Sequence, residues 1–588
     1  MSEQRVCDEM SDAFVRGGTE VLFTLFGDGN LAFVAALAAQ PGMRVVHSRH
    51  EAAAVFMAAG YARATGRVGV VSVTAGPGLA HTMTPLVSAA RAEVPMVIYA
   101  GDTGTSGRFV GGLQDLDQEA FARAAGVPYL RVDRTNAGRT AAAAFELATR
   151  RSCPVLVGVP EDLMELPVLP SDASAPAPPP APAAQPAPVS EPALVSEPAL
   201  VSEPAAGAAA TGSREEHVAA AARVEEALRT AHSPLLVIGS GGADPATVSA
   251  VRELARRYGA RVGTTFRARG VVDDDPATVG IVGPLAHAAH QAAQERADLV
   301  VGFGANLHGF GAFLDVLYDA RTICVGAERY GRWTAPHPAG CGLDVSPSDI
   351  LPLLRDAPAP AGGRRAEASV DRKAVIEADF TELPEAHDEG LLDPRRLILE
   401  LDALIAEDAI VVIGGGHFWS FPLMYLSKKR RDFVFPIEFG SIGMALPTGI
   451  GVAASGTGRD VVVIEGDGGV TASIQEFETA VRSGLDLTVV VMNDGALGAE
   501  LHKLKAKGLA PDESYYEFVD FAGVAGTFGA RSARLTAVGE IAPALDGGRA
   551  GVTVLDARLT RTVTSRWYRR LYLGQIGRLA AGRHPAGA

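Results

Sequence analysis

The sequence predicts an α/β protein with three doubly wound, Rossmann-like domains, each built on a parallel sheet. In each third of the chain, short apolar runs alternate with longer Ala-rich amphipathic runs; examples of the apolar runs are VGVVSVTAG at 68–76, PLLVIGSGG at 234–242 and DVVVIEGDG at 460–468. Continuous apolar strands are buried on both faces, which is typical of a parallel sheet between helices. The chain has 588 residues, whereas a single hydrophobic core stops growing near roughly 250–300 residues. The sequence therefore requires several domains.

Two segments rich in Pro and Ala divide the chain. The first contains VSEPAL twice and VSEPAA once between residues 189 and 206, and the second reads DAPAPAGGRRAEASVDR at 356–372. Such composition offers too little apolar surface to offset the entropy of ordering, and its Pro content favours a semi-extended tether. We therefore expect domains at 1–169, 214–355 and 385–570, linkers at 170–213 and 356–384, and a tail at 571–588. The role of the repeats stays open.

Composition excludes several classes of partner. The formal net charge of −15 argues against a nucleic-acid partner or an anionic membrane surface. The four cysteines form no C-x-x-C pair, so neither a zinc site nor a disulfide framework is indicated, and a reducing cytoplasm is expected. The N-terminus has no apolar signal region, and no apolar run reaches membrane-spanning length.

Two successive strand ends carry the residues of a diphosphate and metal site. The run at 460–464 leads into Glu465, Gly466, Asp467, Gly468 and Gly469, and the next apolar run, LTVVVMN, leads into Asp494, Gly495 and Ala496. Glycines at a strand end let backbone amides approach a diphosphate, and carboxylates hold the hard cation that neutralises it. The GDG sequence alone is equally typical of a β-turn. The second strand end favours the metal site.

These two strand ends resemble the motif of thiamine diphosphate-dependent enzymes, which opens with GDG and closes on the following strand. Asp494 follows Asp467 by 27 residues, as in that motif. The resemblance implies that Asp467, Asp494 and the Ala496 carbonyl bind Mg²⁺, and that Gly466, Gly468, Gly469 and Gly495 contact the cofactor. The family usually has Asn at the position of Asp494, so this chain adds a negative charge.

The segment RVVHSRHEAAAVFMAAGYARATGRVGVVSVTAGPG resembles the pyrimidine-binding domain of the same superfamily. The resemblance implies that the Glu51 carboxylic acid protonates the aminopyrimidine and so promotes loss of the thiazolium C2 proton. On its own, Glu51 is equally typical of a first-turn acid. The stretch TAGPGLAH resembles its acetolactate synthase counterpart, which brings Pro77 to the cofactor and places His81 where that family has Asn. His81 could shuttle protons, or it could only hydrogen-bond at a helix start.

Further segments extend the resemblance. FGSIGMALPTGIG resembles the cofactor-bending segment, which implies that Ile442 lies under the cofactor and that Gly440 offers its carbonyl to the amino group. In GGGHFW, His417 is a candidate cofactor contact. LFGDGNL resembles a loop of pyruvate decarboxylase and places Asp28 on its catalytic aspartate, whereas Gln118 matches a glutamine that acetolactate synthases place near the cofactor.

The resemblance leads us to expect decarboxylation of a 2-oxo acid, with pyruvate as the first choice, and transfer of the acyl carbanion to a carbonyl acceptor. The cofactors implied are thiamine diphosphate and Mg²⁺; GIVGPLAH and ANLHGFG replace the segments expected of a flavin site, so FAD is not favoured. The alternatives are a non-ligating decarboxylase, an acyl-CoA lyase and a flavin-linked oxidoreductase of the pyruvate oxidase type. The arrangement also implies a homodimer or homotetramer with the active site between subunits. The cluster His502, Lys503, Lys505 and Lys507 is either an anion-binding group or a solvated helix face.

Overall fold

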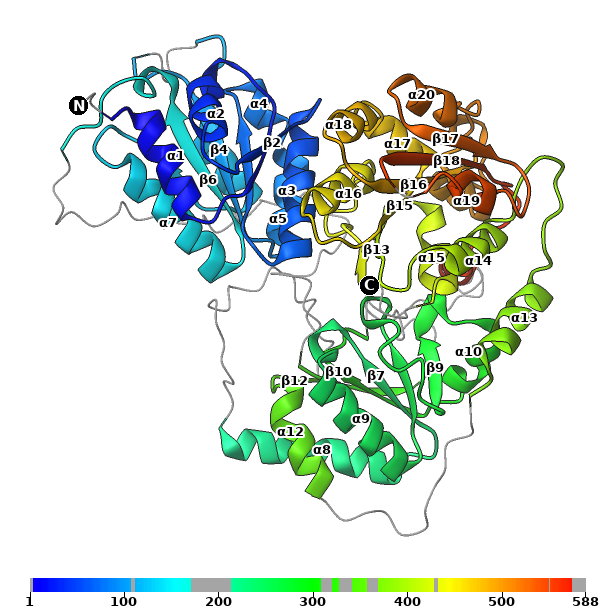
Figure 1. Cartoon of the computed structure of the whole chain (residues 1–588). Coiled ribbons are helices and arrows are strands. Elements are labelled where there is room, and N and C mark those ends of the chain that lie inside the picture. Colours follow the sequence, from blue (N-terminus) through cyan, green and yellow to red (C-terminus); the bar gives the residue numbers. More distant parts are fainter. Residues whose placement is uncertain are drawn as a thin grey trace.

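The computed structural model describes residues 4–106, 112–170, 213–307, 320–326, 341–356, 369–427, 432–548 and 550–573. Three six-stranded sheets follow one another along the chain, and every strand pair in them is parallel (Figure 1). The predicted α/β class with three parallel-sheet domains is confirmed. The predicted tether with the VSEPAL repeats lies outside the described residues, except at its two ends.

The first sheet has the order β2-β1-β3-β4-β6-β5. Its strands are β1 (Val21–Thr24), β2 (Arg44–His47), β3 (Gly69–Val73), β4 (Met96–Asp102), β5 (Tyr129–Arg131) and β6 (Pro154–Pro160). The helices that position the site are α3 (Glu51–Thr65), α4 (Pro77–Ala80), α5 (Met83–Arg91) and α6 (Gln118–Ala125), and the opposite face carries α1 (Val6–Arg16), α2 (Leu31–Ala38) and α7 (Ala137–Arg151). Strands β3, β4 and β6 are buried throughout, as their continuous apolar sequences predict.

The middle sheet has the order β12-β11-β10-β7-β8-β9, which is the strand order of a Rossmann fold. Its strands are β7 (Pro234–Ile238), β8 (Arg261–Thr264), β9 (Thr278–Ile281), β10 (Leu299–Phe303), β11 (Arg321–Val325) and β12 (Gly342–Leu343), and its helices include α8 (Arg214–Thr230), α9 (Pro245–Tyr258), α10 (Ala288–Glu295) and α12 (Pro347–Asp356).

The second predicted linker, 356–384, differs from the structure in its second half, where α13 (Arg372–Glu382) forms. Asp371 caps this helix, since its side chain accepts a hydrogen bond from the Ala374 amide at 2.9 Å. The helix buries Val375 and Asp379. Its apolar residues are not concentrated on one face, so the periodic pattern that reveals most helices is weak here.

The third sheet has the order β14-β13-β15-β16-β18-β17, which repeats the strand order of the first sheet. Its strands are β13 (Ile410–Ile413), β14 (Asp432–Val434), β15 (Val461–Gly466), β16 (Leu487–Asn493), β17 (Arg531–Leu535) and β18 (Val552–Arg558). Its helices are α14 (Pro394–Leu404), α15 (Ser420–Tyr425), α16 (Ala445–Ala454), α17 (Asp467–Ser473), α18 (Glu476–Arg482), α19 (Gly498–Ala506), α20 (Phe521–Thr527), α21 (Ile541–Leu545) and α22 (Arg566–Tyr568), and the last is followed by a π-helical turn, η9 (Arg569–Leu573). The first and third domains therefore share one topology.

The first and third domains pack together through α3 and α16, which lie side by side in Figure 1. A Cβ atom added at Gly60 would overlap the Thr448 carbonyl, and one added at Gly451 would overlap the Met57 carbonyl. The two helices thus touch backbone to backbone, and only glycine allows this approach. Along α3 from Met57 to Gly60, the contacted residue of α16 changes from Gly451 back to Thr448. The two helices therefore run antiparallel. One hydrophobic cluster continues across both domains.

Within the part of the chain that the structure describes, no helix combines the length and apolar character needed to cross a membrane. The four cysteines are buried, and none of them is joined to another by a disulfide.

Replacing Gly451 with Ala should destabilise the protein by about 1–3 kcal/mol, the usual cost of forcing an extra carbon into a packed contact. Gly526 is the matched control, because it is also helical but an added Cβ would meet only the Ser532 hydroxyl at 3.5 Å. Gly526→Ala should be neutral or stabilise by up to about 1 kcal/mol. Urea unfolding of both variants measures the difference, and equal stabilities would show that α3 and α16 are not in backbone contact.

Candidate functional site

A cavity of about 290 Å³ opens at the carboxyl ends of β13, β15 and β16. Parallel strands bring their carboxyl ends to one edge of a sheet, so sequence-distant strand ends meet here. Most of the residues predicted for the diphosphate, metal and cofactor-bending segments line this cavity: His417, Gly440, Ile442, Gly466, Asp467, Gly468, Gly469, Asp494 and Ala496. Gly495 lies between two of them, and its amide donates to Asp467 at 2.8 Å.

The carboxyl groups of the buried Asp467 and the partly exposed Asp494 interact at the ends of two adjacent strands. Asp467 begins α17 and accepts hydrogen bonds from the Gly468 and Gly495 amides, each at 2.8 Å. Asp494 accepts from the Ala496 amide at 3.2 Å. Burial raises the pKa of both carboxyl groups, and the pKa of Asp494 is raised further by the negative charge of Asp467. Two oxygen donors that repel each other and line one cavity are well suited to a hard divalent cation.

Two residues that the sequence analysis did not identify support this pair. The Tyr516 hydroxyl donates to the Ala496 carbonyl at 3.1 Å, on the atom predicted to bind metal. Arg561 donates to the carbonyls of Asp494 and Gly495, the latter at 2.9 Å. Arg561 thus holds the backbone of the second strand end. No local motif marks either residue, because both come to the site through the tertiary fold.

Glu465 is fully buried directly below the glycine loop. Its Oε2 accepts from the Ala445 amide at 2.7 Å, which ties the end of β15 to the start of α16. A Cβ atom at Gly414 or Gly469 would overlap Oε1, so a glycine after β13 and a glycine in α17 make room for this side chain. Burial raises the pKa of Glu465 to about 8. The sequence motif contains Glu465, but its spacing indicated no role for it.

One wall of the cavity is aromatic, and the C-terminal segment supplies three of its rings. His417 accepts from the Ser565 amide at 2.9 Å, and its ring lies 4.0 Å from the His502 ring. Burial lowers the pKa of His417 well below its usual value and that of His502 to about 4, so both rings are neutral at pH 7. Trp567, Tyr568 and Tyr572 complete the wall. They were not predicted, and Tyr572 falls in the segment predicted to be a tail.

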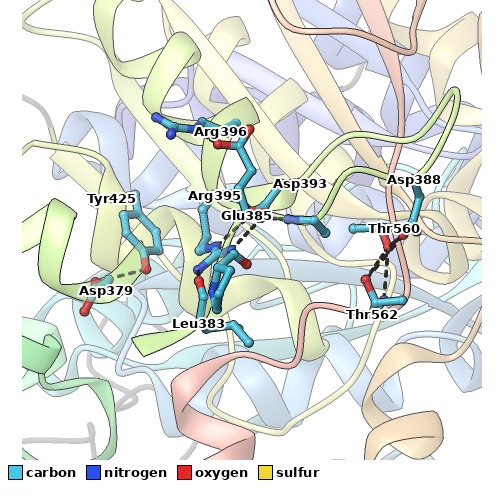
Figure 2. A network of polar contacts seen from close by, with 12 residues as sticks. Asp379, Leu383, Glu385, Asp388, Asp393, Arg395, Arg396, Tyr425, Thr560 and Thr562 are labelled. Atoms are coloured by element: carbon cyan, nitrogen blue, oxygen red, sulfur yellow. Dashed lines mark hydrogen bonds and ion pairs between the residues drawn. The ribbon is translucent and has the colours of Figure 1, made fainter. Parts of the chain in front are cut away.

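The segment between α13 and α14 forms a network of polar contacts that reaches a cavity-lining residue; Figure 2 shows the network. Asp388 accepts hydrogen bonds from Thr560 and Thr562, and Thr560 lines the cavity. Nearby, the buried Arg395 pairs with Asp393 at 2.6 Å and donates to the Leu383 and Pro384 carbonyls. These contacts fix the segment to the third domain.

A second group of predicted residues lies at the carboxyl edge of the first sheet. Glu51 begins α3 and is 8% exposed, and its Oε2 lies 3.0 Å from Nδ1 of His81. The His50 ring lies 4.8 Å from the His81 ring, and its Nδ1 accepts from the Ala52 amide. Pro77 begins α4, the helix that ends just before His81. The bond between Glu51 and His81 joins two residues that the sequence analysis singled out separately.

Asp28 and Gln118 occupy different environments at this edge. Asp28 begins a short 3-10 helix, η1 (Asp28–Asn30), after β1 and is exposed. Gln118 is 1% exposed and donates to the Gly101 carbonyl at 2.6 Å, so it orders the end of β4. A catalytic role for either residue stays a prediction.

The two groups of residues do not meet within one chain. All described residues that line the cavity lie between Pro394 and Tyr572. The antiparallel packing of α3 and α16 explains why the two groups lie apart. Gly60 faces Thr448 and Gly451 faces Met57. Glu51 therefore lies at one end of the helix pair and Ile442 at the other. At a rise of 1.5 Å per residue, the length of α3 separates these ends by about 20 Å.

Comparison with known families gives an independent assignment. The family model described as "Thiamine pyrophosphate enzyme, N-terminal TPP binding domain" matches residues 4–121. The models of the central domain and the C-terminal TPP binding domain of these enzymes match residues 221–327 and 413–557. Thiamine pyrophosphate is another name for thiamine diphosphate. Together with the fold and the site, these matches show that the chain belongs to the thiamine pyrophosphate-dependent enzymes.

Individual relatives are distant. An acetolactate synthase of Mycobacterium bovis is 27% identical over 501 residues, covering 82% of this chain and 74% of the relative. A sulfoacetaldehyde acetyltransferase of Alcaligenes xylosoxydans xylosoxydans is 27% identical over 538 residues, covering 83% and 82%. Among solved structures, the thiamine diphosphate-dependent 4-hydroxybenzoylformate decarboxylase of Rhodococcus jostii RHA1 matches with a TM-score of 0.71 and 20% identity, covering 95% and 99%. This last likeness shows the fold alone.

The buried acids predict an unusual pH dependence of stability. Burial raises the pKa of Glu465 from 4.5 to about 8, so the folded chain binds more protons than the unfolded chain between these values. Stability from this group is present below pH 4.5 and is lost as the pH rises through 8. In Glu465→Gln the side chain is neutral at every pH. Relative to this variant, the unmodified cofactor-free protein should therefore lose thermal stability between pH 5.5 and 8.5. Differential scanning fluorimetry measures both curves, and parallel curves would contradict the burial of a protonated Glu465.

Proposed function

We propose that this enzyme decarboxylates a 2-oxo acid, with pyruvate as the first candidate, and transfers the acyl unit to a carbonyl acceptor, using thiamine diphosphate and Mg²⁺. The observation that carries the proposal is the cavity of the third domain. It combines the carboxyl groups of Asp467 and Asp494, a glycine-rich strand end and Ile442, while the first domain presents Glu51 at a helix start. The family match supports the cofactor, and the acetolactate synthase relative supports the reaction.

The residues present fit the cofactor and its metal. Asp467, Asp494 and the Ala496 carbonyl offer only oxygen donors, which is the chemistry that Mg²⁺ requires. A Cβ at Gly466 would overlap the Phe418 ring, and one at Gly498 would overlap the Asp494 carboxyl group, so glycine keeps this edge open. We propose that these groups hold Mg²⁺ and the diphosphate. Ile442 is 48% exposed, as expected of an apolar side chain that awaits a ligand.

The remaining steps can be assigned to side chains of this chain. When bound, the cofactor supplies a carbon nucleophile that adds to the 2-oxo group and accepts the electrons released with CO₂. The Glu51 carboxyl group provides the proton that activates the pyrimidine, and His81 at 3.0 Å orients that carboxyl group. Trp567, Tyr568 and the neutral His417 exclude water, which favours loss of CO₂ because the reacting charge is dispersed in the transition state.

We further propose that two copies of the chain complete each active site. Glu51 and the diphosphate cavity lie at opposite ends of the α3 and α16 pair, so the first domain of a partner subunit has to supply the acid. A homodimer is then the smallest active form, and a homotetramer is its simple extension. The four buried thiols fit a reducing compartment, and we propose the cytoplasm.

The proposal is tested by incubating the protein with thiamine diphosphate, Mg²⁺ and a panel of 2-oxo acids, followed by mass analysis of the products. We expect CO₂ release and a ligated product from pyruvate. Glu51→Gln fills the same volume but supplies no titratable proton, so it should retain the cofactor and slow hydrogen–deuterium exchange at C2 by about 10²–10⁴-fold.

Three results would contradict parts of this account. An aldehyde as the only product would identify a decarboxylase that does not ligate. Absence of turnover with every acid would reject the reaction class. An exchange rate in Glu51→Gln within a few-fold of the unmodified rate would return Glu51 to the role of a helix-start acid.

A further inference from the structure

Lys503 is the one Lys or Arg among the described residues that line the cavity. It lies on α19, the helix that starts two residues after Ala496 and therefore leaves directly from the metal-binding strand end. Its side chain is one-third exposed, its amino group pairs with Glu500 at 3.2 Å, and it lies 5.8 Å from the centre of the Tyr572 ring. Lys503 thus lies between the metal-binding edge and the aromatic wall.

Lys503 lies in a different environment from the nearby residues His502, Lys505 and Lys507. His502 is buried against His417 and bonds to Thr564, so it is part of the wall. Lys505 is directed to the ring of Tyr515, at 5.8 Å from its centre, and Lys507 is exposed beyond the end of α19. The basic cluster seen in the sequence is therefore not one anion-binding group.

The charges around Lys503 favour an anionic ligand. The other charged residues lining the cavity are Asp467, Asp494 and Glu500, all of them acidic. The first two are assigned to the metal, and among the described residues Glu500 is the carboxylate that pairs with Lys503. Glu500 is about half exposed, so exchanging it for the carboxylate of a ligand exposes no buried charge.

The ligand's anionic group has to be one that the reaction retains. A cation beside the departing carboxylate would stabilise the reactant more than the transition state, in which that charge has moved away, and would slow the step. A cation beside a retained anion binds the reactant and the transition state equally well. We propose that Lys503 binds the carboxylate or sulfonate of an anionic acceptor, a substrate class that rests on the proposed transfer to a carbonyl compound.

The binding test uses two inert probes of the same shape, lactate and its neutral amide, lactamide, with the protein carrying thiamine diphosphate and Mg²⁺. Trp419 and Trp567 line the cavity and report binding by their fluorescence. The unmodified protein should prefer lactate by about 10-fold, the value expected of one charge-assisted contact. Lys503→Met should remove the preference, and Glu500→Gln should strengthen it. Lys507→Met is the matched control and should keep it.

Turnover separates this inference from the proposed function. With pyruvate as donor, Lys503→Met should raise KM for pyruvate as acceptor by about 10-fold and leave KM for neutral acetaldehyde unchanged. If the unmodified protein prefers lactate but forms no product, the proposed function is refuted. The assignment of Lys503 as an anion-binding residue then still holds. Equal preference for lactate in Lys503→Met and the unmodified protein, or no preference in either, would overturn the assignment.

Discussion

The backbone contact between α3 and α16 is the constraint on which the rest of the structure depends. It joins the first and third domains into one hydrophobic core and fixes the direction of two helices whose starts carry functional residues. Because the helices are antiparallel, the strand ends that precede them point to opposite sides of the contact. The chain thus presents an acid at one end and a diphosphate cavity at the other.

Electrostatics explain why the cavity suits a cofactor that brings its own cation. Glu465, Asp467 and Asp494 lie within one strand-end region, and burial raises the pKa of all three. Arg561 contacts this loop by donating to backbone carbonyls, and it thereby orders the loop. A divalent cation between Asp467 and Asp494 would replace their mutual repulsion by attraction. Asp494 carries a negative charge where the family usually has a neutral Asn. The change from repulsion to attraction on binding the cation is therefore larger in this chain.

The sequence predicted the parts of the site that are local. The strand ends around Asp467 and Asp494, the loop with Ile442 and the helix start at Glu51 each lie within one short segment, and a parallel sheet gathers strand ends at a common edge. Tyr516, Arg561 and the C-terminal aromatic residues of the wall could not be predicted in this way, because they reach the cavity over long sequence separations. Helix α13 was assigned to a linker because its amphipathic pattern is weak. The bond between Glu51 and His81 depends on how two strand ends of the first sheet lie in space.

The central claim is that each active site combines Glu51 of one subunit with Asp467 of another, and mixing subunits tests it directly. Glu51→Gln and Asp467→Ala should each have little activity alone, but a mixed dimer would contain one site in which both residues are intact. Unfolding and refolding equal amounts together should restore about a quarter of the unmodified decarboxylase activity, since half of the two-fold dimers are mixed and each has one working site. No recovery in a verified mixed dimer would show that the site forms within a single chain and would contradict this account.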